Sequence, residues 1–303
     1  MERVTPDLLL NKGEVRFRWQ RILQFPLLEL VVAGLFMAPV ALAHNAFAIA
    51  VLEKLQPPLG NLVTYLEHVV NVVLFLLAYA LYCRWVERRK PFEISGGKSV
   101  PELSLGFAGG IGLVGIMVGL LSLLGYYRVS GFSENQTVLI DAFFRFGIGA
   151  FLQEFFIRLL LFRLTEELVG TWSAVVIVAV SFGLIHIGNE NATPLTSVMI
   201  AVSDVLYLAA FVFTRRLWLV WGLHFGWNFM QDGVFGMPNS GETALPSWIR
   251  PDVTGPDWLT GGSFGIEASI VAIALQVALG LWLLLYARKL NQFMAPYWQR
   301  IRR

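Results

Sequence analysis

The sequence predicts an all-α, polytopic membrane protein, a bundle of about eight transmembrane helices around a polar intramembrane cavity. The first observation is composition, since 56% of the 303 residues are hydrophobic and only 15% are charged. Soluble domains average about 45–50% apolar and about 25% charged residues. The second is the recurrence of long apolar runs, and the third is the distribution of basic residues between them.

The transmembrane helices are predicted from eight apolar segments. A helix that crosses the hydrocarbon core needs about 20 mostly apolar residues. The segments that qualify are residues 25–51, 61–83, 103–125, 138–162, 171–187, 194–213, 217–235 and 264–287. The fifth and seventh are short or polar, so their ends are the hardest to fix. No soluble domain or repeat interrupts them, and residues 1–303 are treated as a single transmembrane domain.

The basic residues alternate between the two ends of these segments. Connections on one side carry 18 Lys and Arg residues and those on the other side carry 3, with Arg145 and Arg158 inside the fourth segment. Cytoplasmic loops collect Lys and Arg, so this asymmetry predicts an even number of spans with both termini in the cytoplasm. The single cysteine, Cys83, excludes an internal disulfide and a cysteine-cluster metal site.

The seventh connection, residues 236–263, is long and contains four prolines together with Trp248 and Trp258. Indole rings favour the headgroup level of a bilayer. We therefore expect an ordered loop that rests at the non-cytoplasmic interface. Ordinary loop packing is favoured over a role in covering a site.

Charged residues inside the apolar segments are the candidates for chemistry. A charge at the bilayer centre costs about 2.5–3.5 kcal/mol on insertion scales, so such residues face protein or a wet cavity. Glu154 and Arg158 lie one helical turn apart and are predicted to form an ion pair. Asp141 and Arg145 have the same spacing and are predicted to pair near the interface. Asp204, in the sixth segment, either lines the cavity or accepts a hydrogen bond from a neighbouring helix.

Two histidines follow in later segments. His186 ends the fifth apolar run, and a histidine in that position is by itself more often an interfacial hydrogen-bonding residue than a catalyst. His224 and Asn228 lie on one face of the seventh segment, and polar groups that face the same way at membrane depth need a common partner or water. Together with Gln153, these residues predict that three helices converge on one polar site.

The polar residues form three patterns in order, Gln153-Glu154-x-x-x-Arg158, Phe182-x-x-x-His186 and His224-x-x-x-Asn228. They resemble the motifs of the CPBP family of intramembrane proteases, Glu-Glu-x-x-x-Arg, Phe-x-x-x-His and His-x-x-x-Asn or Asp. That family includes the type II CAAX prenyl endopeptidases and Abi-type bacterial relatives. The resemblance covers about residues 138–235.

The resemblance implies an intramembrane endopeptidase. In the family, the first glutamate and the first histidine of the motifs hold the attacking water, and these positions correspond to Gln153 and His186. By the same resemblance, His224 and Asn228 would bind the oxyanion. It also implies a membrane-associated protein or peptide as substrate, the lipid bilayer as surroundings, no nucleic acid, and a bacterial or archaeal cell membrane. Prenylated substrates belong to one branch, which the residues do not identify.

The sequence departs from the family at position 153. A carboxylate accepts a proton from water as a general base, whereas the neutral amide of Gln153 cannot. The proton must go elsewhere, and His186 is the nearby candidate. Two explanations of Gln153 remain. The chain is either an inactive Glu-to-Gln variant of a protease or a natural pseudoprotease that acts as a membrane binding or immunity protein.

Two further alternatives follow from the same residues. Glu154, His186 and His224 would be the ligands if zinc were bound, but the sequence has no His-Glu-x-x-His pairing, and a site without metal or other cofactor is favoured. Buried charges also mark secondary transporters. No matched pair of interrupted segments occurs in the two halves of the sequence, which argues against that class.

Overall fold

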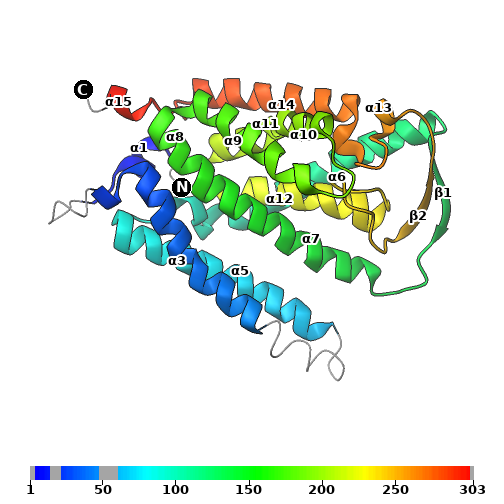
Figure 1. The fold of residues 1–303 in the computed structure, drawn as a ribbon, viewed down its shortest axis with the longest axis horizontal. Helices are drawn as coiled ribbons and strands as arrows, with labels where there is room; N and C mark the ends of the chain where they lie inside the picture. The colour runs from blue at the N-terminus through cyan, green and yellow to red at the C-terminus, as the bar shows by residue number, and fades with distance from the viewer. Residues whose placement is uncertain (1–3, 14–21, 48–60, 301–303) are drawn as a thin grey trace.

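The computed structural model describes residues 4–13, 22–47 and 61–300. Several residues of the charge count lie outside these ranges, namely Arg3, Arg16, Arg18, Arg21, Lys54, Arg302 and Arg303. The chain forms a bundle of helices that run roughly side by side, with α3 and α5 along one edge and α14 along the other (Figure 1). The two termini lie at one end, and a pair of strands lies at the other.

The longer helices match the predicted segments in order. They are α3 (Pro26–Phe47), α5 (Leu62–Tyr82), α6 (Ser99–Leu123), α7 (Val138–Glu154), α9 (Thr171–Ile185), α10 (Pro194–Ser203), α11 (Val205–Thr214), α12 (Leu217–Asn228) and α14 (Ile270–Lys289). The sixth predicted segment is therefore two helices, which meet at Asp204. The eighth helix begins at Ile270, later than predicted, because the preceding residues form a turn of 3₁₀-helix.

Shorter elements complete the fold. The α-helices are α1 (Pro6–Leu10), α8 (Arg163–Val169), α13 (Asp257–Thr260) and α15 (Tyr297–Arg300). Segments η2 (Cys83–Glu87), η5 (Phe155–Phe162) and η7 (Phe229–Val234) are π-helical and continue α5, α7 and α12. The 3₁₀-helical turns are η3 (Phe92–Ile94), η4 (Gly96–Lys98), η6 (His186–Gly188) and η8 (Ile266–Ala268).

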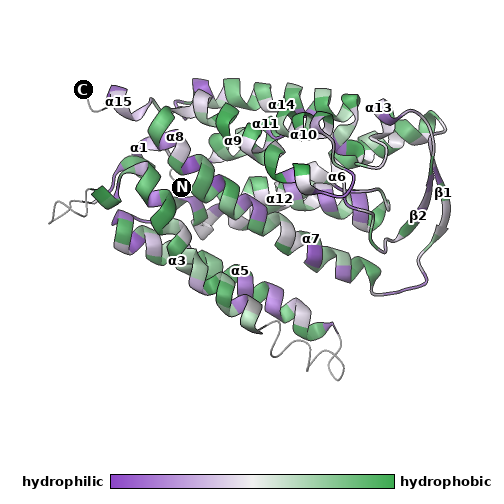
Figure 2. Cartoon of the chain, viewed as in Figure 1, coloured by the Kyte–Doolittle hydropathy of each residue, from purple (hydrophilic) through white to green (hydrophobic). Residues whose placement is uncertain are grey.

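Six helices of the described chain are long and apolar enough to cross a membrane. They are Pro26–His44, Leu62–Glu87, Phe92–Leu123, Thr171–Gly188, Pro194–Thr214 and Ile270–Lys289. The predicted fourth and seventh segments are also helical, but they carry the charged and polar residues of the candidate site. Large apolar side chains are widely exposed along the helices, as expected of surfaces that face lipid. Hydrophobic residues predominate along most of the long helices (Figure 2). The protein is a multi-pass integral membrane protein.

A small sheet interrupts the otherwise helical fold. Strand β1 (Tyr127–Phe132) pairs antiparallel with β2 (Ile249–Val253), and the register shifts between Val129 and Gly131. Tyr127 faces the protein, and its hydroxyl donates to the carbonyl of Phe235 at 2.8 Å. The sheet thus ties the third connection to the seventh, at the end of the bundle away from the termini (Figure 1).

Close helix packing positions α12 against α6. A Cβ on Gly222 would lie 2.2 Å from the carbonyl oxygen of Leu103, and one on Gly226 would lie 2.2 Å from that of Phe107. The opposing glycines are equally tight, because Cβ atoms on Gly106 and Gly110 would meet backbone atoms of α12 at 2.2 and 2.3 Å. Two interlocked small-xxx-small pairs therefore fix the helix that carries His224 and Asn228.

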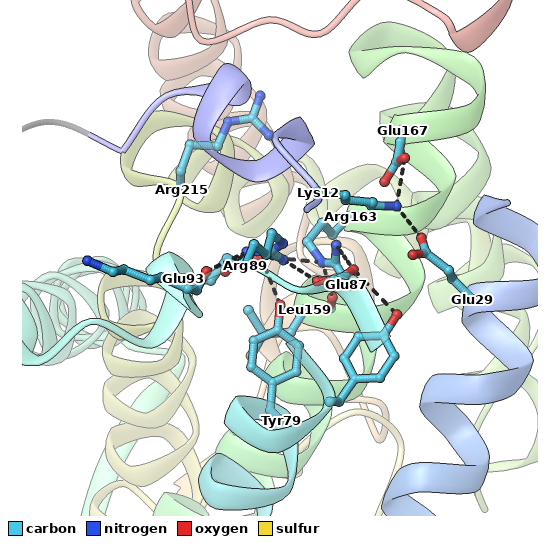
Figure 3. A network of polar contacts seen from close by, with 12 residues as sticks. Lys12, Glu29, Tyr79, Glu87, Arg89, Glu93, Leu159, Arg163, Glu167 and Arg215 are labelled. Carbon is cyan, nitrogen blue, oxygen red and sulfur yellow. Dashed lines mark hydrogen bonds and ion pairs between the residues drawn. The ribbon is translucent and has the colours of Figure 1, made fainter. Parts of the chain in front are cut away.

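A buried charge network holds together the end of the bundle where the termini lie (Figure 3). Arg163 pairs with Glu87 at 2.6 Å, and Arg89 pairs with both Glu87 and Glu93 at 2.7 and 2.6 Å. Lys12, from the N-terminal segment, bridges α3 and α8 through contacts to two carboxylates. Several basic residues of the sequence asymmetry are thus buried in ion pairs, whose attraction offsets part of the cost of taking the charges out of water.

Candidate active site

A cavity of about 330 Å³ lies between α7, α9, α12 and the seventh connection. Gln153, His186 and Asn228 all line it, one from each of the three predicted helices. Exposing these polar side chains to lipid would cost free energy, and a shared cavity explains why all three face the inside of the bundle. The structure brings these three side chains together.

One face of α7 forms a wall of this cavity. Arg145, Gly149 and Gln153 follow one another at intervals of four residues, and all three line it. A Cβ on Gly149 would meet no atom within 4 Å, so the wall is open there. The side-chain oxygen of Gln153 is buried and has no partner among the described residues, so it is available to accept a hydrogen bond from a ligand in the cavity.

His186 begins the 3₁₀ turn η6 at the end of α9. Its Nδ1 lies 2.7 Å from the carbonyl oxygen of Phe182, the residue one turn earlier. A carbonyl only accepts hydrogen bonds, so Nδ1 carries the proton of this contact. In the neutral ring Nε2 is therefore a lone-pair acceptor. The Phe182-x-x-x-His186 pattern sets this tautomer.

His224 is held by a carboxylate. Its Nδ1 lies 2.7 Å from Oε1 of Glu154, and the other oxygen of Glu154 accepts from Nε of Arg158 at 2.7 Å. The predicted Glu154–Arg158 ion pair therefore forms. Asp204 accepts hydrogen bonds from the two remaining nitrogens of the Arg158 guanidinium, one of them at 2.9 Å. All three charged groups are at most 1% exposed.

The local helix geometry changes beside this chain of groups. The α-helical part of α7 ends at Glu154 and that of α12 ends at Asn228, and a π-helical stretch follows each. Single π-helical turns inside α-helices are frequent at functional sites. The break between α10 and α11 likewise falls at Asp204. Each helix that supplies a charged or polar group thus departs from regular geometry near that group.

A second and smaller cavity, of about 30 Å³, adjoins the first. His186 and Asn228 line both cavities, and His224 lines the smaller one. The ring of Tyr207 packs against that of His224, with centroids 5.2 Å apart. Asp204 therefore meets both expectations for it, since it accepts hydrogen bonds from Arg158 and also lines this cavity.

Arg145 does not pair with Asp141, so that prediction was wrong. Asp141 instead accepts hydrogen bonds from Asn61 at 2.7 Å and Thr137 at 2.8 Å, and also from the hydroxyl of Tyr65. Neighbouring polar groups on α5 and on the turn before α7 satisfy this carboxylate. The guanidinium of Arg145 lies over the ring of Phe146, 4.8 Å from its centroid, and borders the larger cavity.

The seventh connection contributes directly to the cavity wall, contrary to the expectation of ordinary loop packing. Asn239, Ser240, Glu242, Thr243 and Leu245 line the larger cavity. The loop is fastened at two places. Asn189 donates to the carbonyl of Ser240 at 2.6 Å. Glu267 accepts from Gln231 at 2.6 Å and from the Ser240 N–H at 3.2 Å.

The set suggested for zinc, Glu154, His186 and His224, does not fit a metal in this arrangement. Both oxygens of Glu154 are engaged, one by Arg158 and one by His224. Within residues 4–13, 22–47 and 61–300, no group of three or more His, Cys, Asp or Glu side chains is arranged to hold a metal ion.

Sequence reasoning missed the residues that support the site from outside the motifs. Gln276, from α14, and Glu267, from the turn before it, line the smaller cavity. Gln276 lies in an ordinary apolar helix and Glu267 in a loop, so no pattern in the sequence marks either of them as a site residue. The glycines that fix α12 against α6 did have a signal, since Gly106-x-x-x-Gly110 and Gly222-x-x-x-Gly226 are small-xxx-small motifs.

The family comparison covers the part of the chain that builds this site. Residues 135–230 match the family model described as type II CAAX prenyl endopeptidase Rce1-like. The match contains all three motifs, from Gln153 to Asn228, and confirms the resemblance seen in them. No curated protein and no solved structure matches the chain.

Proposed function

We propose that this chain, whose residues 135–230 match the Rce1-like model of type II CAAX prenyl endopeptidases, is an intramembrane endopeptidase. Its substrate is a peptide bond of a membrane-associated protein or peptide. The observation that carries the proposal is the meeting of Gln153, His186 and Asn228 on one cavity, with His224 on the adjoining one. The cavity of about 330 Å³ is large enough to admit a segment of peptide chain.

The attacking water lies between Gln153 and His186. The unpartnered oxygen of Gln153 accepts a hydrogen bond from the water and orients it. The Nε2 lone pair of His186 takes one proton as the water oxygen bonds to the carbonyl carbon. The same histidine then returns that proton to the leaving amide nitrogen, so the products are a carboxyl group and an amine.

The developing oxyanion is bound by His224 and Asn228. The Nδ1–H of His224 is already used by Glu154, so a neutral ring offers only a lone pair at Nε2 and cannot donate to an oxyanion. His224 therefore acts as an imidazolium, whose Nε2–H donates to the oxyanion. The carboxylate of Glu154 stabilises that charge, and the Asn228 amide supplies a second donor.

Gln153 impairs this chemistry in the chain as it stands. With a glutamate at 153, a carboxylate would share the proton of the water with His186. With the amide, His186 is the only proton acceptor of the pair. Glutamine at 153 is also the feature that favours a second candidate function, a catalytically inactive pseudoprotease that binds a membrane partner. If the Gln153→Glu variant cleaves a substrate and the chain itself does not, the result supports an impaired protease over a pseudoprotease.

The proposed orientation places both termini in the cytoplasm. The carbonyl of Val4 accepts a hydrogen bond from the Gln292 side chain at 3.0 Å, so the N- and C-terminal segments lie at the same end of the bundle (Figure 1). An even number of spans requires this arrangement. The excess of basic residues in the connections on that side supports the cytoplasmic assignment.

The experiment that tests the proposal is His224→Ala, made in a Gln153→Glu background. Loss of an oxyanion donor lowers kcat by about 10²–10³. We expect cleavage of a membrane-anchored peptide to be lost while the variant keeps the elution volume and helical content of its parent in detergent. Turnover at the parent rate would remove His224 from the mechanism.

A further inference from the structure

The small cavity beside the two histidines is lined by buried polar groups that the reaction outlined above does not use. Ser203 comes from the end of α10, Trp227 from α12 and Gln276 from α14. Their side chains are only 4%, 1% and 1% exposed. They come from three different helices, so a single sequence motif would not reveal them.

Each of these side chains has a buried polar atom without a partner in the described part of the chain. The atoms are Oγ of Ser203, Nε1 of Trp227 and Nε2 of Gln276. Buried polar groups in proteins are almost always hydrogen-bonded, to protein or to ordered water. Three side chains with such atoms line one cavity, which points to a ligand that accepts their hydrogen bonds.

Size and charge limit what that ligand is. The volume of about 30 Å³ exceeds the roughly 10–15 Å³ that a cavity needs to hold one water molecule, and it is far too small for peptide or lipid. The indole N–H of Trp227 and the amide N–H of Gln276 have no lone pair with which to ligate a metal ion. The carboxylate of Asp204, on the same wall, disfavours an anion. A water molecule fits, because it accepts from the donors and can donate to the carboxylates or the histidines.

We propose that this cavity is a buried water site, held by Ser203, Trp227 and Gln276, from which the hydrolytic water is supplied. His186 and Asn228 border both cavities, so a water that leaves the small one passes directly to the position opposite Gln153. The bilayer core contains almost no water, so a site in it benefits from a local store. The supply role rests on the proposed function; the water site itself does not.

A matched pair of serines on α10 tests whether the site holds water. Oγ of Ser197 is also buried without a partner, but it lies on neither cavity. Replacing an unpaired buried hydroxyl by Ala is neutral or stabilising, so Ser197→Ala should leave the midpoint of thermal unfolding unchanged or raise it. Ser203→Ala removes a hydrogen bond to water and should lower that midpoint by about 2–4 °C.

The direct measurement is a map of the full chain at a resolution that shows ordered waters. We expect density within hydrogen-bonding distance of Ser203 Oγ, Trp227 Nε1 and Gln276 Nε2. A map that resolves these side chains without density between them would overturn the water site. So would a Ser203→Ala midpoint that rises as that of Ser197→Ala does. Gln276→Met, which keeps the side-chain length, provides a second variant should Ser203→Ala not fold.

The supply role has its own test in the Gln153→Glu background. Ser203→Ala should lower kcat by about three- to tenfold and leave KM unchanged, since the water and not the peptide is affected. Ser197→Ala should change neither constant. A bound water with an unchanged kcat would overturn the supply role, whereas a parent that cleaves nothing would overturn the proposed function and leave the water site standing.

Discussion

Glu154 and His224 are joined by a 2.7 Å hydrogen bond between a carboxylate oxygen and Nδ1 of the imidazole, although they lie 70 residues apart. This contact engages Nδ1 of His224 and leaves Nε2 as the free ring nitrogen. In the proposed mechanism, the carboxylate stabilises the charged form of the ring. Arg158 and Asp204 hold Glu154 in place from the other side. The motif glutamate at 154 is thus a positioning residue for a histidine on another helix.

Glu154→Gln tests this relationship. The amide keeps one hydrogen bond to His224 but removes the negative charge that stabilises the imidazolium. In the Gln153→Glu background we expect kcat to fall by about 10²-fold, with KM nearly unchanged. The matched control is Glu102→Gln, which alters a carboxylate that pairs with Arg216, the residue directly before α12. Equal activity of the Glu154→Gln variant and its parent would contradict the role.

The packing of α12 on α6 predicts a large effect of a single methyl group. The Cβ of a Gly222→Ala variant would lie 2.2 Å from the carbonyl oxygen of Leu103, so one helix must shift. Overpacking of this kind costs about 1–3 kcal/mol. We expect a lower unfolding midpoint in detergent and reduced cleavage, since the shift also displaces His224.

Gly112→Ala is the control for this prediction. Gly112 is on α6, in the same helix as the opposing glycines, but a Cβ there would meet no atom within 4 Å. Alanine stabilises a helix interior relative to glycine by about 1 kcal/mol, so this variant should be at least as stable as its parent. Similar midpoints for the two alanine variants would contradict the interlocked glycine contact.

Glu267 predicts a dependence of stability on pH. Burial raises the pKa of this carboxyl from 4.5 to about 7, although it accepts hydrogen bonds from Gln231 and Ser240. The folded state thus keeps a proton that the unfolded chain loses near 4.5. Its stabilising effect is complete below pH 4.5 and is lost as the pH rises to 7, a change of about 3 kcal/mol in the free energy of unfolding.

The measurement compares the parent with Glu267→Gln between pH 5 and 8. The amide cannot ionise, so the difference in unfolding midpoint between variant and parent should grow as the pH rises. The other ionisable groups that border this cavity, His186, Asp204 and His224, are present in both proteins, so their contributions largely cancel in the difference. A constant difference across this range would show that Glu267 does not change its protonation on folding.

The fold could be predicted from the sequence to the level of helix order. Long apolar runs predict the helices that face lipid, and the basic residues predict which helix ends lie on the same side of the membrane. Asp204 shows the limit of this reasoning, because hydropathy joins α10 and α11 into one run across the break. The sequence also gave no indication that Arg163 and Arg215 are fully buried in ion pairs with glutamates from elsewhere in the chain.

The site was predictable where partners lie one turn apart and not where they lie on different helices. The spacing of Glu154 and Arg158 predicts their ion pair, and the pair forms. The same spacing failed for Asp141 and Arg145, because nearer hydroxyl and amide groups satisfy Asp141. No sequence pattern predicts that Gln276 belongs to the site, because its position beside the histidines depends on how α14 packs.

The most direct test of the central claim is a cleavage assay on the Gln153→Glu variant beside the chain as it stands, each with and without a chelator. With glutamate at 153 we expect cleavage of a membrane-anchored peptide at a rate well above that of the parent, and no effect of the chelator. Failure of the Gln153→Glu variant to cleave, while it remains folded, would contradict the protease account and favour a binding role.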